Sequence, residues 1–157
     1  MKIGIFGTGA YGMALSSILA HNKCEVTMWT KFEEEKNNLE ITRKNEILIP
    51  NFKIDDKIKL TTNIEECAIN KDLLIIAIPA AFVDSLCVSL KPYINKDHIL
   101  IATKGIEQGS GLFINEILEK HLNTNNIAVL SGPTFAVDIV KKKPIGLSVA
   151  SKKTETI

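Results

Sequence analysis

Short apolar runs alternate along the chain with segments whose apolar residues recur at helical spacing. Several of the short runs are apolar throughout, which is typical of strands that are covered on both faces. Strands that alternate with helical segments indicate a parallel sheet. The pattern therefore predicts an α/β fold with a doubly wound, mostly parallel sheet and helices on both faces. The seven predicted strands cover residues 2–6, 25–29, 59–61, 73–78, 99–103, 128–131 and 146–150.

Two intervening segments have a clear helical period and predict the crossover helices that parallel strands need. One lies between the first two strands, and the other between the strands at 99–103 and 128–131. Residues 32–57 are polar, with a turn at Pro50 and Asn51, and we expect a solvated helix and loop there. The helical positions are Tyr11, Ala14, Leu15, Ile18 and Leu19 in the first segment, and Phe113, Ile117, Leu118 and Leu122 in the second.

Length and charge narrow the class of protein. With 157 residues and 45% hydrophobic content, the chain can bury one good core, so we expect a single domain at 1–157. The formal net charge of +1 excludes a broad basic face for nucleic acid or an anionic membrane surface. The longest apolar run, at 73–83, is interrupted by Pro79 and falls short of the ~20 residues that span a bilayer. A small anionic ligand fits this composition better than a large charged partner.

The three cysteines, Cys24, Cys67 and Cys87, lie in apolar stretches and form no CxxC pair. They are typical of reduced core residues, and they favour a cytoplasmic protein. The sequence has neither a Ser/His/Asp arrangement nor a cluster of His, Cys and carboxylates at metal-ligand spacing. We therefore expect no metal site.

A glycine-rich motif, GTGAYG at 7–12, follows the first predicted strand and opens the first predicted helix. Gly7 would allow a tight turn, Gly9 would let the backbone approach a pyrophosphate, and Gly12 would let the helix pack closely on the strand. The helix N-terminus offers free backbone N–H groups to bound phosphates. In this context the motif predicts a Rossmann-type dinucleotide site, although a glycine loop can also serve chain geometry alone.

The end of the second strand bears on which dinucleotide is bound, because an acidic residue there would accept a hydrogen bond from the ribose 2′-hydroxyl of NAD. Here the strand ends in Trp29, Thr30 and Lys31, which present a hydroxyl and an ammonium instead. We therefore predict use of NADP(H), with NAD(H) as an additional coenzyme. Two alternatives stay open: Lys31 as a solvated surface lysine, and one of the glutamates at 33–35 reaching the ribose.

Two clusters lie at the expected carboxyl ends of later strands, where ligands of open α/β sheets bind. Lys104 directly follows an apolar run, so that its ammonium can contact a phosphate or polarise a carbonyl, or simply reach water. Gly132 and Thr134 lie in a turn that opens a helix. Thr134 can cap that helix or turn its hydroxyl to a ligand.

Acid–base groups are sparse. Ketone reduction by hydride transfer needs a proton donor at the carbonyl oxygen. His21, His98 and His121 all fall at positions that we expect to be remote from the carboxyl ends of the strands. Unless Lys104 donates the proton, no catalytic residue is identified in this chain.

Four motifs together resemble bacterial NAD(P)-dependent glycerol-3-phosphate dehydrogenase, over essentially the whole chain. They are GTGAYGMAL at 7–15, VTMW at 26–29, ATKGIE at 102–107 and LSGPTFA at 130–136. The resemblance implies interconversion of dihydroxyacetone phosphate and sn-glycerol 3-phosphate with NAD(P)H, for glycerophospholipid biosynthesis. It leaves open a homodimer of the full-length enzyme.

The resemblance also implies site residues. Coenzyme contacts would come from Gly7, Gly9, Ala10, Tyr11, Gly12, Lys31, Lys104 and Ala136, and substrate contacts from Lys104, Gly132 and Thr134. Ala10 stands where the family often has Ser or Asn, so one polar contact to the coenzyme is missing.

Family members continue into a helical C-terminal domain that holds the catalytic lysine and most of the phosphate site. We therefore expect the catalytic lysine beyond Ile157, and we expect this chain alone to bind the dinucleotide with little or no activity. Two alternatives are another two-domain NAD(P)-dependent dehydrogenase, such as ketopantoate reductase, and a non-catalytic dinucleotide-sensing module.

Overall fold

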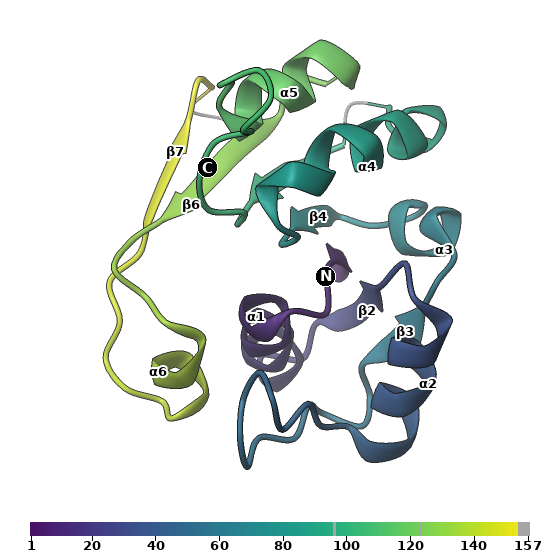
Figure 1. Cartoon of the computed structure of the whole chain (residues 1–157), viewed down its shortest axis with the longest axis vertical. Helices are drawn as coiled ribbons and strands as arrows, with labels where there is room; N and C mark the ends of the chain where they lie inside the picture. Colours follow the sequence, from purple (N-terminus) through teal and green to yellow (C-terminus); the bar gives the residue numbers. More distant parts are fainter. Residues whose placement is uncertain (96, 123, 154–157) are drawn as a thin grey trace.

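A seven-stranded sheet forms the centre of the computed structural model, which describes residues 1–95, 97–122 and 124–153 (Figure 1). The strand order is β3-β2-β1-β4-β5-β6-β7, and the first six strands are parallel. This is the doubly wound order of dinucleotide-binding folds, with one antiparallel strand added at the edge. The strands are β1 (Lys2–Phe6), β2 (Glu25–Trp29), β3 (Lys59–Thr61), β4 (Leu73–Ile76), β5 (Ile99–Ile101), β6 (Ile127–Ser131) and β7 (Ser148–Ser151).

The predicted α/β fold class is confirmed, with small errors at strand ends. β4 and β5 both stop two residues before the ends of the apolar runs that predicted them. The reason is that an apolar run records burial, which continues past the last residue of the hydrogen-bonded ladder: Ala102 is still 3% exposed. β7 begins two residues later than expected and pairs with β6 in the antiparallel sense.

Helices cover both faces of the sheet. They are α1 (Ala10–His21), α2 (Glu33–Thr42), α3 (Ile64–Ala68), α4 (Val83–Leu90), α5 (Ile114–His121) and α6 (Ala136–Val140), with 3₁₀ turns at Ala80–Phe82 and Lys91–Tyr93. Residues of α3, α4 and α5 pack into one hydrophobic cluster, and residues of α1, α2 and α6 pack into another. Figure 1 shows these two groups of helices on opposite sides of the strands. None of the helices in the described ranges is long and apolar enough to cross a membrane.

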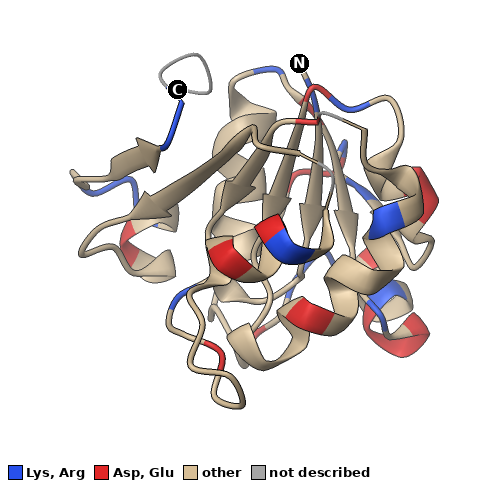
Figure 2. Ribbon diagram, turned by 90° about the horizontal axis from the view of Figure 1, so that it is seen from above, with Lys and Arg blue, Asp and Glu red and all other residues tan. Residues whose placement is uncertain are grey.

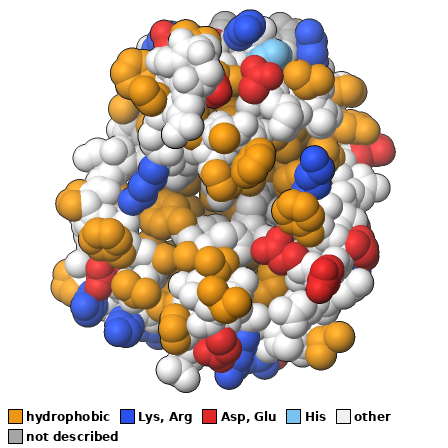
Figure 3. Space-filling model, viewed as in Figure 1, with side chains coloured by type: hydrophobic (Ala, Val, Ile, Leu, Met, Phe, Trp, Pro, Cys, Tyr) orange, Lys and Arg blue, Asp and Glu red, His pale blue; other side chains and the backbone are white. Residues whose placement is uncertain are grey.

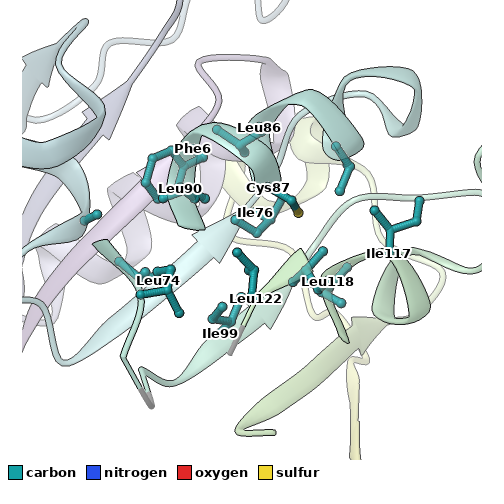
Figure 4. Close-up of a cluster of buried hydrophobic side chains, with 14 of the residues drawn as sticks. Phe6, Leu74, Ile76, Leu86, Cys87, Leu90, Ile99, Ile117, Leu118 and Leu122 are labelled. Carbon is teal, nitrogen blue, oxygen red and sulfur yellow. The ribbon is translucent and has the colours of Figure 1, made fainter. Parts of the chain in front are cut away.

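The first cluster fills the layer between the sheet and helices α4 and α5 (Figure 4). Leu86, Cys87 and Leu90 of α4 face Ile76 of β4, and Leu118 of α5 completes the layer. This burial explains why the predicted crossover helix near 113–122 forms: its apolar stripe has a sheet to cover.

Segment 32–57 is less solvated than predicted. Its helix, α2, buries Leu39, and the loop beyond buries Ile49 and Ile54 at 1% exposure each. Ile58, just past the segment, is buried too. Single apolar residues separated by polar ones carry no strand or helix period, so the pattern gave no sign that this loop lies against the α1 side of the core.

Candidate functional site

The carboxyl ends of the six parallel strands lie along one edge of the sheet, as the aligned arrowheads of Figure 2 show. Three connections rise from this edge: the glycine loop after β1, the Lys104 turn after β5 and the Gly132 turn after β6. On the face seen in Figure 3, hydrophobic side chains gather around a hollow. The candidate site is this edge.

The glycines of the loop differ in what surrounds them. Gly7 has a φ of +125°, and a Cβ there would lie 2.4 Å from the carbonyl oxygen of Ala77. A Cβ at Gly12 would lie 2.3 Å from the carbonyl oxygen of Gly7, so only glycine allows the helix to start this close to the loop. A Cβ at Gly9, in contrast, would meet no atom within 4 Å. The backbone at Gly9 is therefore open to an approaching group, which is the space that a pyrophosphate needs.

Helix α1 starts directly at this opening. Its N-cap, Gly9, has no side chain to bond the helix end, and the backbone N–H of Met13 donates to the carbonyl of Gly9 at 2.9 Å. The N–H groups of a first helical turn have no partners within the helix. At the start of α1 these groups belong to Ala10, Tyr11 and Gly12, which leaves them free for an anion.

Lys104 lies between two of the connections. Its ammonium donates a hydrogen bond to the carbonyl of Thr134 at 2.9 Å and sits 5.0 Å from the centroid of the Tyr11 ring. A cation at this distance from an aromatic face is attracted by the ring. Burial raises the pKa of the Tyr11 phenol, so its hydroxyl stays protonated and able to donate. The structure thus brings Tyr11, Lys104 and Thr134 together from three separate parts of the sequence.

The Gly132 turn is shaped by a close backbone approach. Gly132 has a φ of +152°, and a Cβ there would lie 2.5 Å from the carbonyl oxygen of Gly146. Thr134 is 2% exposed, and its hydroxyl donates to that same carbonyl at 3.2 Å. Of the two roles expected for Thr134, the helix cap is wrong, because α6 begins at Ala136 and its N-cap is Phe135. The hydroxyl instead donates its hydrogen bond to Gly146, twelve residues further along the chain.

The end of β2 forms a separate part of the edge. Lys31 is exposed there, directly after Thr30. The Thr30 hydroxyl donates a hydrogen bond to the carboxylate of Glu35, which belongs to the first turn of α2. Glu33 instead accepts from the hydroxyl of Thr62 at 2.8 Å. Glu35 was one of three glutamates that the sequence could not place, since the contact depends on how α2 leaves the strand.

The histidines lie elsewhere. His21 ends α1 and lines a cavity of about 760 Å³ at the amino ends of β1 and β2, on the edge away from the glycine loop. His98 precedes β5, and His121 contacts Asp84 of α4 at 2.8 Å. The described residues include no group of His, Cys, Asp and Glu that could hold a metal ion. None of the three histidines therefore lies at the candidate site, where a proton would have to be transferred.

Exposed aromatic rings lie at this edge, and the sequence reasoning missed two of them, Phe32 and Phe135. Phe32 is 64% exposed next to the end of β2, Phe82 is 60% exposed after β4, and Phe135 is 68% exposed in the Gly132 turn. Each follows a strand of the parallel sheet by a few residues, so the order of elements could have placed them at this edge. Exposed rings at a binding edge offer apolar and stacking surface to a planar ligand.

Known proteins match this chain over nearly its whole length. Residues 2–157 match the family model described as NAD-dependent glycerol-3-phosphate dehydrogenase N-terminus. A glycerol-3-phosphate dehydrogenase [NAD(P)+] of Leptospira biflexa is 36% identical over 99% of this chain and 48% of its own length. One of Fusobacterium nucleatum is 34% identical over 99% of this chain and 47% of its own length. The chain thus spans about half the length of the curated relatives it matches.

Solved structures agree with this result. A crystal structure of glycerol-3-phosphate dehydrogenase from Coxiella burnetii has a TM-score of 0.89 at 26% identity, covering 98% of this chain and 47% of that one. A ketopantoate reductase from Ralstonia eutropha has a TM-score of 0.65 at 20% identity, covering 83% and 41%. The second likeness concerns the fold alone.

Proposed function

This chain belongs to the family of NAD-dependent glycerol-3-phosphate dehydrogenase N-terminal domains, and we propose that it is the coenzyme-binding domain of such an enzyme. The proposed reaction interconverts dihydroxyacetone phosphate and sn-glycerol 3-phosphate by hydride transfer with NAD(P)H, for glycerophospholipid synthesis. Residues 1–157 form the single coenzyme-binding domain in this proposal. The three free cysteines support a cytoplasmic setting.

The observation that carries the proposal is the open backbone at Gly9 beside the start of α1. Gly7 and Gly12 are held by close contacts with the protein itself, whereas Gly9 faces empty space. A loop that served chain geometry alone would not need a glycine at position 9. The space and the N–H groups of α1 fit a pyrophosphate.

The coenzyme roles follow from position along this edge. In the proposal the loop at Gly7, Gly9 and Gly12 and the backbone of Ala10 and Tyr11 hold the pyrophosphate. Lys31, exposed at the end of β2, attracts the 2′-phosphate of NADP(H) without preventing NAD(H) from binding. Lys104 and Ala136 border the nicotinamide half of the crevice.

The substrate roles rest on the group around Lys104. Its ammonium is held between a backbone carbonyl and a ring face, so it is available to a phosphate or to an oxygen that gains negative charge. In the proposal Gly132 and Thr134 shape the adjacent wall, and Lys104 touches both coenzyme and substrate. When bound, the coenzyme supplies the hydride.

The proton donor is proposed to lie outside residues 1–157. None of the three histidines lies at the carboxyl edge, and the relatives are about twice as long as this chain. The chain alone is therefore proposed to bind the dinucleotide with little or no turnover. Its small-molecule partner is a phosphorylated triose or glycerol, and a homodimer of the full-length enzyme is compatible with the proposal.

Calorimetric titration of the chain with NADPH and with NADH tests the proposal. The informative variant is Gly9→Val, because a Cβ there meets no protein atom within 4 Å, so the fold should be retained while the side chain fills the phosphate space. Gly146→Val is the matched control, since a Cβ at Gly146 also meets no atom within 4 Å. We expect the wild type and the control to bind at least one dinucleotide and Gly9→Val to lose binding. Failure of the wild type to bind either dinucleotide would refute the proposal.

A further inference from the structure

A buried hydroxyl fixes a carboxylate at the end of β2. Thr30 is 4% exposed, and its hydroxyl donates a hydrogen bond to a carboxylate oxygen of Glu35. The backbone N–H of Thr30 donates to the carbonyl of Thr61 at 3.1 Å, so Thr30 is itself anchored to β3. A rigid donor of this kind limits the positions that the half-buried Glu35 side chain can take.

This carboxylate lies close in the fold to the start of the glycine loop. Phe6 and Trp29 are paired residues at the ends of β1 and β2, and the backbone N–H of Gly7 donates to the carbonyl of Trp29 at 2.9 Å. The glycine loop and Thr30 therefore leave the sheet side by side. A dinucleotide whose pyrophosphate lies on that loop puts its adenosine ribose at the end of β2.

Among the described residues, no cationic side chain forms an ion pair with Glu35. Lys36 points to the other carboxylates of α2, at 3.6 Å from Glu33 and 3.0 Å from Glu40. Among the ion pairs of the described residues, none involves Glu35 or Lys31. A carboxylate has about four lone-pair sites, and Thr30 uses one, so Glu35 retains acceptors for a ligand hydroxyl.

We infer that Glu35 is a specificity-determining residue that accepts the ribose 2′-hydroxyl of NAD(H) and restrains the preference for NADP(H) that Lys31 would otherwise confer. The inference rests on the proposed function. A 2′-phosphate at this point would meet a fixed negative charge, whereas a 2′-hydroxyl would donate to it. Lys31 acts in the opposite sense, so the two side chains together set the ratio of the two affinities.

The inference is tested by measuring dissociation constants for NADH and NADPH by calorimetry, at one fixed salt concentration. Glu35→Gln removes the charge and keeps an acceptor for Thr30, so the fold should be retained. We expect it to lower the ratio of the NADPH dissociation constant to the NADH dissociation constant by about tenfold. NADH would exchange a hydrogen bond to a charged group for a weaker one, whereas NADPH would no longer be repelled by the carboxylate. Thr30→Val should shift the ratio in the same direction by a smaller factor, since it frees the carboxylate without removing it.

Glu34→Gln is the matched control, because Glu34 lies on the same helix with the same charge and is exposed. We expect this variant to leave the ratio of the two dissociation constants within about twofold of the wild-type ratio, because an exposed charge is screened by salt. If Glu35→Gln leaves the ratio unchanged, or if Glu34→Gln changes it equally, the inference is wrong while the proposed function stands. If the wild type binds neither nucleotide, the proposed function fails first and the inference fails with it.

Discussion

The ammonium of Lys104 lies 5.0 Å from the centre of the Tyr11 ring, although the two residues are far apart in sequence. Tyr11 belongs to the first turn of α1, at the glycine loop, and Lys104 follows β5. The contact joins the proposed pyrophosphate site to the proposed substrate site. The two proposed sites would thus be fixed relative to each other before any ligand binds.

The Tyr11 and Lys104 pair predicts a shared effect on coenzyme binding. Lys104→Met should weaken NADPH binding by about tenfold, because a charged group next to the coenzyme is lost. Tyr11→Leu should weaken it by a smaller factor, whereas Tyr11→Phe keeps the ring face and should retain most of the affinity. Calorimetry measures all three. Lys91→Met, at an exposed lysine of the turn after α4, is the control, and an equal loss in that variant would contradict the assignment.

Lys31 predicts an unequal effect on the two coenzymes. Lys31→Glu reverses the charge at the end of β2, so NADPH binding should fall by about tenfold or more relative to NADH binding. Dissociation constants for both coenzymes are measured for Lys31→Glu and for a control variant, Lys57→Glu. The control makes the same charge change at the cavity on the opposite edge of the sheet. If Lys31→Glu weakened NADPH binding and NADH binding equally, the assignment of Lys31 to the 2′-phosphate would be wrong.

The loop after α2 predicts a contrast between two isoleucines of one segment. Ile54 is 1% exposed and Ile47 is 93% exposed. Ile54→Ala should lower the free energy of unfolding by about 2–5 kcal/mol, since it leaves a cavity in the core. Ile47→Ala should change it by less than about 0.5 kcal/mol. Urea denaturation monitored by circular dichroism measures both, and similar values would show that the loop does not pack on the core.

Glu107 predicts a pH-dependent loop. Its carboxylate accepts the backbone N–H groups of Gly109 at 2.8 Å and Ser110 at 2.5 Å, and also the Ser110 hydroxyl. These bonds lower the pKa of Glu107 below its ordinary value of 4.5. A lowered pKa in the folded state means that the contribution is present above the unfolded-state value and is lost as the pH falls through the folded-state value.

The expected result is faster hydrogen exchange at Gly109 and Ser110 in acid than the intrinsic pH dependence of exchange accounts for. The change should begin below about pH 4.5, the ordinary value of the group. In Glu107→Gln the amide no longer titrates, so the extra acid dependence should disappear. Its persistence in that variant would assign the effect to another group.

The cysteines predict a count of reactive thiols. Burial raises the pKa of both Cys67 and Cys87 to about 12, whereas Cys24 is partly exposed. Thiolate is the reactive form, so an alkylating reagent at neutral pH should label Cys24 in the native chain and all three cysteines after denaturation. Mass spectrometry gives the count directly. Rapid native labelling of Cys87 would show that α4 is not packed as described.

Sequence reasoning predicted the fold well because the sheet is buried on both sides. Runs such as 2–6 and 25–29 are mainly apolar where each strand is covered by helices, and their bounds matched the structure. The segment near Ile54 was missed because isolated apolar residues in a polar loop have no period to detect. Regular burial leaves a pattern in sequence, and irregular burial does not.

The candidate site was only partly accessible to sequence reasoning. The glycine loop could be placed, because its motif includes the strand and helix around it. Thr134 was given two alternative roles, as a helix cap or as a ligand contact, and its hydroxyl instead bonds to the carbonyl of Gly146. Glu35 was left among three neighbours, since only the path of α2 shows which of them reaches Thr30. Contacts across the chain depend on tertiary geometry, which short-range spacing does not encode.

The direction of β7 has a consequence for how any following chain is routed. β7 starts opposite Ser131, at the carboxyl edge of the sheet, and ends opposite Ala128, nearer the other edge. The strand therefore runs away from the edge that carries the glycine loop. Any later segment that contributed to the proposed reaction centre would have to return along the outer side of β7 to the carboxyl edge, so contacts with this edge strand would help to position it.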